Sequence, residues 1–155
     1  GGMEGDIVSV ERVIKAPPEK IFEIIADASR HPEIDGSGTV RAAKPGAPQR
    51  LFPGATFGMS MKMGIPYSMV NTVVEYEENR RIAWQARPPG LLGRIVGGRI
   101  WRYELEPVEG GTLVRESWDI SQDRQRALLK RTKLPEQTRR NMERTLENIA
   151  RLVEG

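Results

Sequence analysis

The sequence holds one histidine, and the acidic and hydroxyl side chains that follow it form a cluster that could move a proton. Glu33, Asp35 and Ser37 lie within six positions of His31. An imidazole beside carboxylates can act as a proton carrier near neutral pH. In a second interpretation, His31 and Asp35 cap and brace a loop. We favour the bracing role and keep His31 as a catalytic candidate.

Glu116 is the second catalytic candidate, because it stands in a strand-like run among apolar residues. It shares strand phase with Val114 and Trp118, so we expect the three side chains to point the same way. If that face is buried, the carboxyl pKa rises into the range that suits general acid or base work. The alternative is that Glu116 pairs with Arg102 or Arg99 across a hairpin.

The composition excludes several other chemistries. The chain has no cysteine, which rules out thiolate catalysis, disulfides and thiolate metal sites. A single histidine excludes a metal site with several histidine ligands. The sequence shows no Gly-rich phosphate loop, dinucleotide fingerprint or EF-hand pattern. We therefore expect neither a metal nor a cofactor.

Length and charge indicate one domain with a basic segment. At 155 residues the chain has the size of a single domain, expected over residues 6–153, and its net charge is +3. Residues 122–144 hold eight Lys or Arg against three Asp or Glu. Because these cations are not interleaved with Phe, Tyr or Trp, we expect no nucleic-acid binding and favour a solvated helical face. Contact with an acidic partner is the alternative.

The apolar runs are too short to span a bilayer, and the first residues lack the basic and apolar regions of a signal peptide. We therefore expect a cytoplasmic protein without stable membrane insertion. Residues 1–5, which include Gly1 and Gly2 before Met3, are expected to be a disordered N-terminus or an added remnant outside the domain.

The elements that must position these side chains follow from two periodicities. Alternation of apolar and polar residues predicts seven strands, and Pro17-Pro18-Glu19 predicts the start of a helix after the first of them. A short helical turn and a loop follow over residues 27–38. Helical spacing of apolar residues predicts a long amphipathic helix over residues 135–153. The predicted strands cover residues 6–15, 39–44, 54–63, 67–76, 81–87, 99–107 and 112–121.

This order of elements is similar to the helix-grip fold of the START and Bet v 1-like (SRPBCC) superfamily, a group described as polyketide cyclase/dehydrase and lipid transport proteins. Three local patterns carry the resemblance: residues 16–22 with Ala26-Asp27, residues 76–84, and residues 101–107 with Gly110-Gly111-Thr112. The resemblance implies an α+β fold, with a seven-stranded curved antiparallel sheet around the C-terminal helix and two short helices after the first strand. It also implies an apolar cavity between sheet and helix.

In such relatives the cavity holds lipids, sterols, polyketides or other hydrophobic molecules. Strand and helix phase then indicate which side chains would line it here, with ordinary core filling as the alternative for each. Methionine is flexible, so a row of methionines suits a surface that adapts to irregular ligands. The expected ligand-binding residues are Phe57, Met59, Met61, Trp84, Trp101, Tyr103, Trp118, Thr138, Met142 and Leu146.

The closing helix is therefore expected to have two parts. Thr138, Met142 and Leu146 would face the cavity, while Ile149, Leu152 and Val153 would seal one end of the sheet. The segment of residues 88–98 is both loop-like and apolar. We expect it to form a mobile lip over the cavity entrance or a self-association patch of a homodimer, with a monomer as the other state. Its apolar residues are Leu91, Leu92, Ile95 and Val96.

The function expected from the sequence is binding of a hydrophobic small molecule in this cavity. The first alternative is a polyketide cyclase, aromatase or dehydrase that uses the same cavity, with Glu116 or His31 moving a proton. A third hypothesis is an interaction protein that uses the basic segment of residues 122–144.

Overall fold

The computed structural model describes residue 3 and residues 5–154. The prediction for residues 1–5 falls mainly on positions 1, 2 and 4, which lie outside the described residues. In chain order the elements are β1 (Ile7–Ile14), α1 (Pro18–Ile25), η1 (Ala28–Arg30), α2 (His31–Ile34), β2 (Val40–Ala43), β3 (Thr56–Met63), β4 (Ile65–Glu77), β5 (Arg81–Arg87), η2 (Gly90–Arg94), β6 (Arg99–Val108), β7 (Gly111–Asp119), α3 (Arg126–Leu129) and α4 (Leu134–Glu154).

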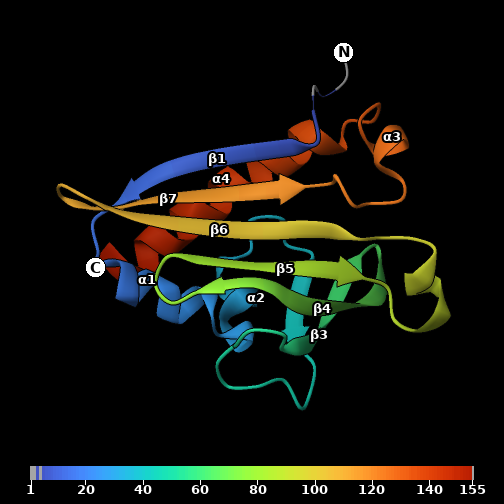
Figure 1. Cartoon of the computed structure of the whole chain (residues 1–155), viewed down its shortest axis with the longest axis horizontal. Helices are drawn as coiled ribbons and strands as arrows, with labels where there is room; N and C mark the ends of the chain where they lie inside the picture. Colours follow the sequence, from blue (N-terminus) through green and yellow to red (C-terminus); the bar gives the residue numbers. More distant parts are fainter. Residues whose placement is uncertain (1–2, 4, 155) are drawn as a thin grey trace.

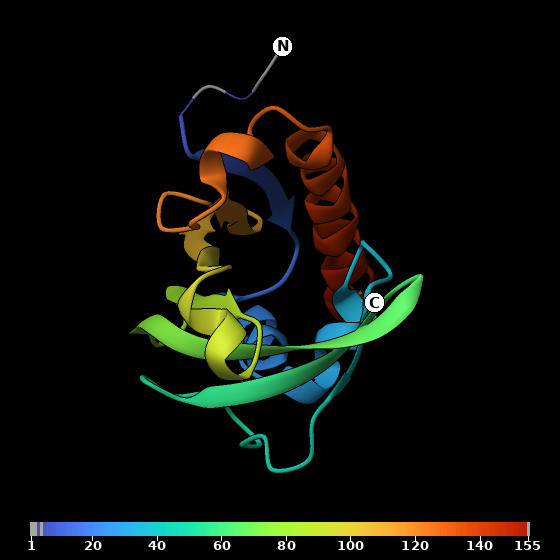
Figure 2. The same ribbon diagram turned by 90° about the vertical axis from the view of Figure 1, so that its right-hand side faces the viewer.

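The described strands form one antiparallel seven-stranded sheet in the order β1-β7-β6-β5-β4-β3-β2. Register shifts between Val40 and Ala42 and between Val73 and Glu75 bend the sheet, because an extra residue in one strand increases its local twist. The sheet curls around α4, which runs along its open side (Figures 1 and 2). The predicted α+β helix-grip fold, with short helices after β1, is confirmed.

Helix α4 closes the sheet through a buried stripe that contacts β1, β7, α1 and α2. Its C-terminal half belongs to the core through Ile149, Ala150 and Val153, which pack with α1 and β1 side chains. The expectation that Leu152 helps to seal the sheet was wrong, because this side chain is 42% exposed. The stripe steps by three or four residues through Ile149 to Val153, and Leu152 lies to one side of it.

The loop after α2 is fixed directly to α4. The Gly36 amide donates to Thr145 Oγ1 (2.9 Å), and Asn148 Nδ2 donates to the Ile34 carbonyl (3.1 Å). A Cβ added at Gly36 would lie 2.1 Å from the Asn141 carbonyl oxygen, so only glycine allows this approach. These contacts hold the end of α2 and the loop that follows it against α4.

Three local predictions differ from the structure. His31 begins α2 and does not lie in a loop, because Pro32 suits the first turn of a helix. The predicted strands 54–63 and 67–76 leave Ile65 and Pro66 between them as a turn, but the chain reverses at Gly64 (φ 77°) and both residues already belong to β4. Strand β4 pairs with β5 only from Val70 onward, so Pro66 has a paired neighbour on one side only. The short elements η2 and α3 lie in segments predicted as loop or left unassigned.

Candidate ligand-binding cavity

A cavity of about 730 Å³ lies between the sheet and the N-terminal half of α4. Strands β3 to β7 supply one wall, and α2, the loop after it and α4 supply the other. Drug-sized ligands occupy pockets of roughly 300–1,000 Å³, so the volume suits a whole small molecule. Segments η2 and α3 lie at the end of the molecule that faces the viewer in Figure 2.

Strand register explains the aromatic wall of this cavity. Trp84, Trp101 and Trp118 are successive partners across β5, β6 and β7, so their side chains leave the same face of the sheet. The rings of Trp101 and Trp118 have centroids 6.5 Å apart, and those of Trp84 and Tyr103 are 5.8 Å apart. All four residues line the cavity. They form a broad apolar surface with a few polar edges.

His31 is buried in this wall. Its ring stacks on Trp84 at a centroid distance of 4.8 Å and an angle of 19°. Its Nε2 lies 2.8 Å from the Ile25 carbonyl oxygen, and because a carbonyl only accepts, Nε2 carries the proton. Burial lowers the pKa of His31. These contacts favour a neutral imidazole that braces α2, although the ring also borders the cavity.

Asp35 likewise holds the loop that follows α2. Its carboxylate accepts from the Ser37 amide (3.2 Å), the Ser37 hydroxyl (2.8 Å) and the Val40 amide (3.1 Å). This pattern is the Asx-type bracing expected from the sequence. Both Asp35 and Ser37 border the cavity, so the brace also forms part of the wall.

Glu116 points into the cavity from β7 and is 4% exposed. Burial raises the pKa of its carboxyl group well above the usual value, with the Tyr103 phenol opposing the shift and Asp35 adding to it. The arginines considered as partners are bound elsewhere: Arg102 to Glu75 (2.8 Å) and Asp119 (3.3 Å), and Arg99 to Asp123 (3.2 Å). The alternative pairing across the hairpin is therefore wrong, since Arg102 lies on the opposite strand phase from Tyr103, the partner of Glu116, and the preferred inward orientation of Glu116 agrees with its burial.

Two buried polar atoms on β7 have no hydrogen-bond partner. They are Glu116 Oε1 and Trp118 Nε1, and both residues line the cavity. Buried polar groups in native proteins nearly always have a partner, so each such atom asks for an explanation. Both atoms are buried, and both residues belong to the cavity lining, where a bound molecule could supply the missing partners.

The apolar segment of residues 88–98 borders the cavity with only some of its residues. Val96 borders the cavity, whereas Leu91, Leu92 and Ile95 project into solvent, with Leu91 75% exposed. Gln125 ties this segment to the start of α3: its Nε2 donates to the Ile95 carbonyl (3.2 Å), and its Oε1 accepts from the Gly97 amide (3.1 Å).

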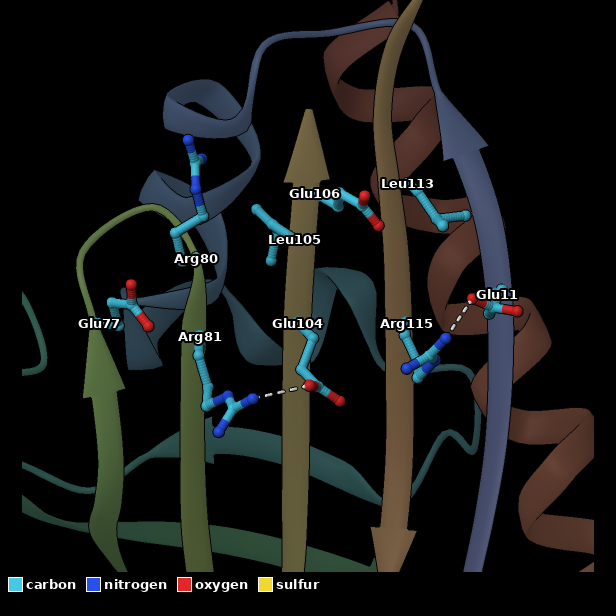
Figure 3. Close-up of a pocket in the computed structure, with 9 residues that line it drawn as sticks. All are labelled: Glu11, Glu77, Arg80, Arg81, Glu104, Leu105, Glu106, Leu113 and Arg115. Atoms are coloured by element: carbon cyan, nitrogen blue, oxygen red, sulfur yellow. Dashed lines mark hydrogen bonds and ion pairs between the residues drawn. The ribbon is translucent and has the colours of Figure 1, made fainter. Parts of the chain in front are cut away.

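A second, smaller depression of about 230 Å³ lies on the outer face of the sheet (Figure 3). Its lining is mostly charged, and the charges pair across strands: Arg115 with Glu11 (2.8 Å) and Arg81 with Glu104 (3.0 Å). Side chains already paired in this way have little capacity left for a ligand. The cavity beneath α4 is therefore the better candidate site.

A family model described as "Polyketide cyclase / dehydrase and lipid transport" matches residues 6–154. The chain belongs to this family. Curated relatives in two strains of Mycobacterium tuberculosis, H37Rv and CDC 1551, are both named as uncharacterized proteins. Each is 35% identical over 108 residues, which is 68% of this chain and 44% of the relative. The chain thus spans less than half the length of these relatives.

Solved structures show the same fold for this member of the cyclase/dehydrase and lipid transport family. Protein CV1439 from Chromobacterium violaceum has a TM-score of 0.72 at 17% identity, covering 97% of this chain and 98% of that one. The Aha1 dimer from Colwellia psychrerythraea has a TM-score of 0.66 at 17% identity and 96% coverage of both chains. Protein Ms6760 from Mycobacterium smegmatis has a TM-score of 0.70 at 15% identity, covering 96% of this chain and 94% of that one.

The structure brings most of the sequence-predicted ligand residues of this family member to the cavity. Phe57 and Leu146 are buried but lie outside the cavity lining, and Phe57 packs edge-on against His31 and Trp84. Those that border the cavity are Met59, Met61, Trp84, Trp101, Tyr103, Trp118, Thr138 and Met142.

Sequence reasoning missed several lining residues. Tyr67 and Met69 share strand phase with the buried Asn71, and this spacing was the signal that could have found them. Asn141 and Thr145 lie three and seven residues after Thr138, on the same face of α4. The prediction rested mainly on apolar residues, and these two side chains are polar.

Among the described residues, no group of three or more His, Asp or Glu side chains lies close enough to hold a metal ion. In the same part of the chain, no helix is long and apolar enough to cross a membrane.

Proposed function

We propose that this chain binds a hydrophobic small molecule, such as a lipid or polyketide, in the cavity between the sheet and α4. The observation that carries the proposal is a volume of about 730 Å³ walled by methionine and aromatic side chains. Burial of apolar ligand surface contributes about 25 cal/mol per Å², so roughly 300 Å² would supply about 7.5 kcal/mol before the entropic cost of binding. The family description, which names lipid transport, supports the same reading.

Entry to the cavity is proposed to involve the apolar segment of residues 88–98. Leu91, Leu92 and Ile95 are exposed beside Val96, which borders the cavity. Such a surface suits a lip that folds over a bound hydrophobe, or a patch that joins two copies of the chain. The similar Colwellia protein is described as a dimer, which makes self-association a reasonable second role for this patch.

Substitution of Met142 tests the proposal. Met142 borders the cavity from α4, so Met142→Trp should fill part of the volume and weaken binding of a hydrophobic fluorescent probe at least tenfold. Leu152→Trp is the matched control, because Leu152 lies on the same helix and is largely outside the core. The control should bind the probe like the wild-type protein. Equal binding by Met142→Trp and wild type would count against the proposal.

A second candidate function is a cyclase or dehydrase reaction in the same cavity. The observation that favours it is a buried carboxyl group with a raised pKa, Glu116, across from the Tyr103 phenol. Such a carboxyl group suits general acid or base work on a polyketide-like chain. Glu116→Gln should then abolish turnover while folding and binding remain. Turnover that survives Glu116→Gln would exclude this role for Glu116.

The basic segment of residues 122–144 supports a lesser proposal, contact with an acidic partner. Arg139 already pairs with Glu136 and Glu143 on α4, which is the pattern of a solvated helical face. Reversing the charges of Arg140 and Arg144 together with Arg139 should abolish such a contact, and an unchanged affinity for the acidic partner would rule it out.

A further inference from the structure

Two polar atoms without a partner come from residues of β7 that line the cavity. Glu116 Oε1 and Trp118 Nε1 come from residues two positions apart on one strand face, about 7 Å along the strand. Trp118 is fully buried and Glu116 nearly so, and both line the cavity. Leaving such atoms unbonded in the folded protein is unfavourable, so their positions indicate a ligand group that completes them.

The chemistry of the two side chains limits what that group can be. The Trp118 indole N–H can only donate, so its partner must be an acceptor. A neutral carboxyl group at Glu116 can donate or accept a hydrogen bond. Burial raises the pKa of this group, which favours the neutral form. A carbonyl oxygen can accept from both side chains. A hydroxyl group can accept from Trp118 and donate to Glu116.

The charges around the cavity disfavour an anionic ligand. Arg99 is the only Lys or Arg among the described lining residues, and its Nε donates to Asp123 Oδ2 (3.2 Å). The carboxylate of Asp35 also borders the cavity, and the buried His31 has a lowered pKa. A carboxylate placed beside Glu116 would therefore lose its hydration without gaining an available cation.

We propose that the cavity holds a hydrophobic molecule with a neutral carbonyl or hydroxyl group, whose oxygen accepts a hydrogen bond from Trp118 Nε1 and bonds the Glu116 carboxyl group. The inference rests on the proposed function, because it names the chemical class of the ligand for the same site. It assigns Trp118 and Glu116 as the residues that orient this ligand, and the aromatic and methionine surfaces as those that bind its apolar body.

Three naphthalene probes of matched shape test the inference. The first is 6-propionyl-2-(dimethylamino)naphthalene, a neutral ketone; the second carries a propyl group in place of the propionyl group; the third carries a carboxylate there. Dissociation constants are measured by fluorescence titration at neutral pH for the wild-type protein, Glu116→Leu and Trp118→Phe. The ratio of ketone affinity to propyl affinity isolates the hydrogen bonds, because the apolar bodies are alike.

Each substitution should lower that ratio by about three- to tenfold, the range expected for one hydrogen bond to a neutral group. Met59→Leu, which changes a lining residue without a hydrogen-bonding group, should leave the ratio unchanged. The carbonyl stretching frequency of the bound ketone, read by infrared spectroscopy, should be lower in the wild-type protein than in either variant. Circular dichroism confirms that each variant is folded, and Glu116→Leu keeps the test decisive if Trp118→Phe is unstable.

The outcomes separate this inference from the function beneath it. An unchanged ratio in both variants, with all neutral probes still bound, would overturn the inference and leave hydrophobic binding intact. Tighter binding of the carboxylate than of the ketone would also overturn it. Failure of the wild-type protein to bind either neutral probe would refute the proposed function, and the inference with it.

Discussion

Replacing Glu116 by leucine should make the protein more stable while impairing recognition of a polar ligand. Glu116 Oε1 is buried without a partner, and burial raises the pKa of the carboxyl group. An unsatisfied buried polar group destabilises a fold by about 1–3 kcal/mol, and leucine of similar size removes it. In a chain of 155 residues, this gain corresponds to a rise in Tm of roughly 2–12 °C.

The gain should depend on pH in a defined direction. Because the carboxyl pKa is raised in the folded state, the native protein keeps its proton where the unfolded chain, with a pKa near 4.5, has lost it. The contribution of the protonated Glu116 carboxyl group to the free energy of unfolding is thus fully present below about pH 4.5. It falls as pH rises through the folded pKa, by up to about 1.4 kcal/mol per pH unit. Asp35 and Tyr103 also influence this titration. Glu116→Leu removes the decline, so its advantage over wild type should grow with pH.

Thermal and urea unfolding of both proteins across this pH range measure the effect. Glu104→Leu is a matched control, because Glu104 lies in the adjacent strand on the outer face and pairs with Arg81 (3.0 Å). It should change stability by less than about 1 kcal/mol and should give no gain. If Glu116→Leu proves less stable than wild type at neutral pH, Glu116 makes a stabilising interaction and the reasoning fails.

Three further substitutions have expected outcomes of their own. Burial lowers the pKa of His31, so the contribution of its neutral ring to stability is present above about pH 6.5 and is lost as pH falls through the folded pKa. His31→Phe should therefore reduce the loss of unfolding free energy at acid pH, measured by unfolding curves at a series of pH values. An unchanged dependence of that free energy on pH would contradict this role. Gly36→Ala should destabilise the protein by about 1–3 kcal/mol in urea unfolding, because the new Cβ meets the Asn141 carbonyl, and a neutral result would show that the loop can shift. Leu91→Ser with Leu92→Ser should leave Tm unchanged but slow probe uptake or dissociate a dimer in sedimentation analysis; no change in either would dispose of both roles for this segment.

Strand phase correctly predicted that Glu116 and Trp118 share one face of the sheet, but it did not predict which side chains on a face reach the cavity. A period of two places Glu116 and Trp118 on the face of β7 that lines the cavity. The same rule groups Phe57 with Met59 on β3, yet Phe57 packs against His31 and Met59 borders the cavity. Phase gives the face of a strand, whereas position along a bent sheet depends on its bulges and its contacts with α1 and α2.

Helical spacing had a similar limit on α4. It predicted a stripe from Thr138 to Val153, but it could not show that the cavity ends near Thr145 and that the core begins beyond it. Near that boundary the Gly36 amide donates to Thr145 Oγ1, a contact between residues more than 100 positions apart in the sequence. Contacts at such separation leave no periodic signal.

The most direct test of the account is native mass spectrometry of the protein purified from an extract of its own cells. The account predicts an adduct of a few hundred daltons on the wild-type chain, bearing a neutral oxygen group, and loss of that adduct in Met142→Trp, which fills the cavity. A wild-type protein that remains consistently free of ligand, or a Met142→Trp protein that retains the same adduct, would contradict hydrophobic binding beneath α4.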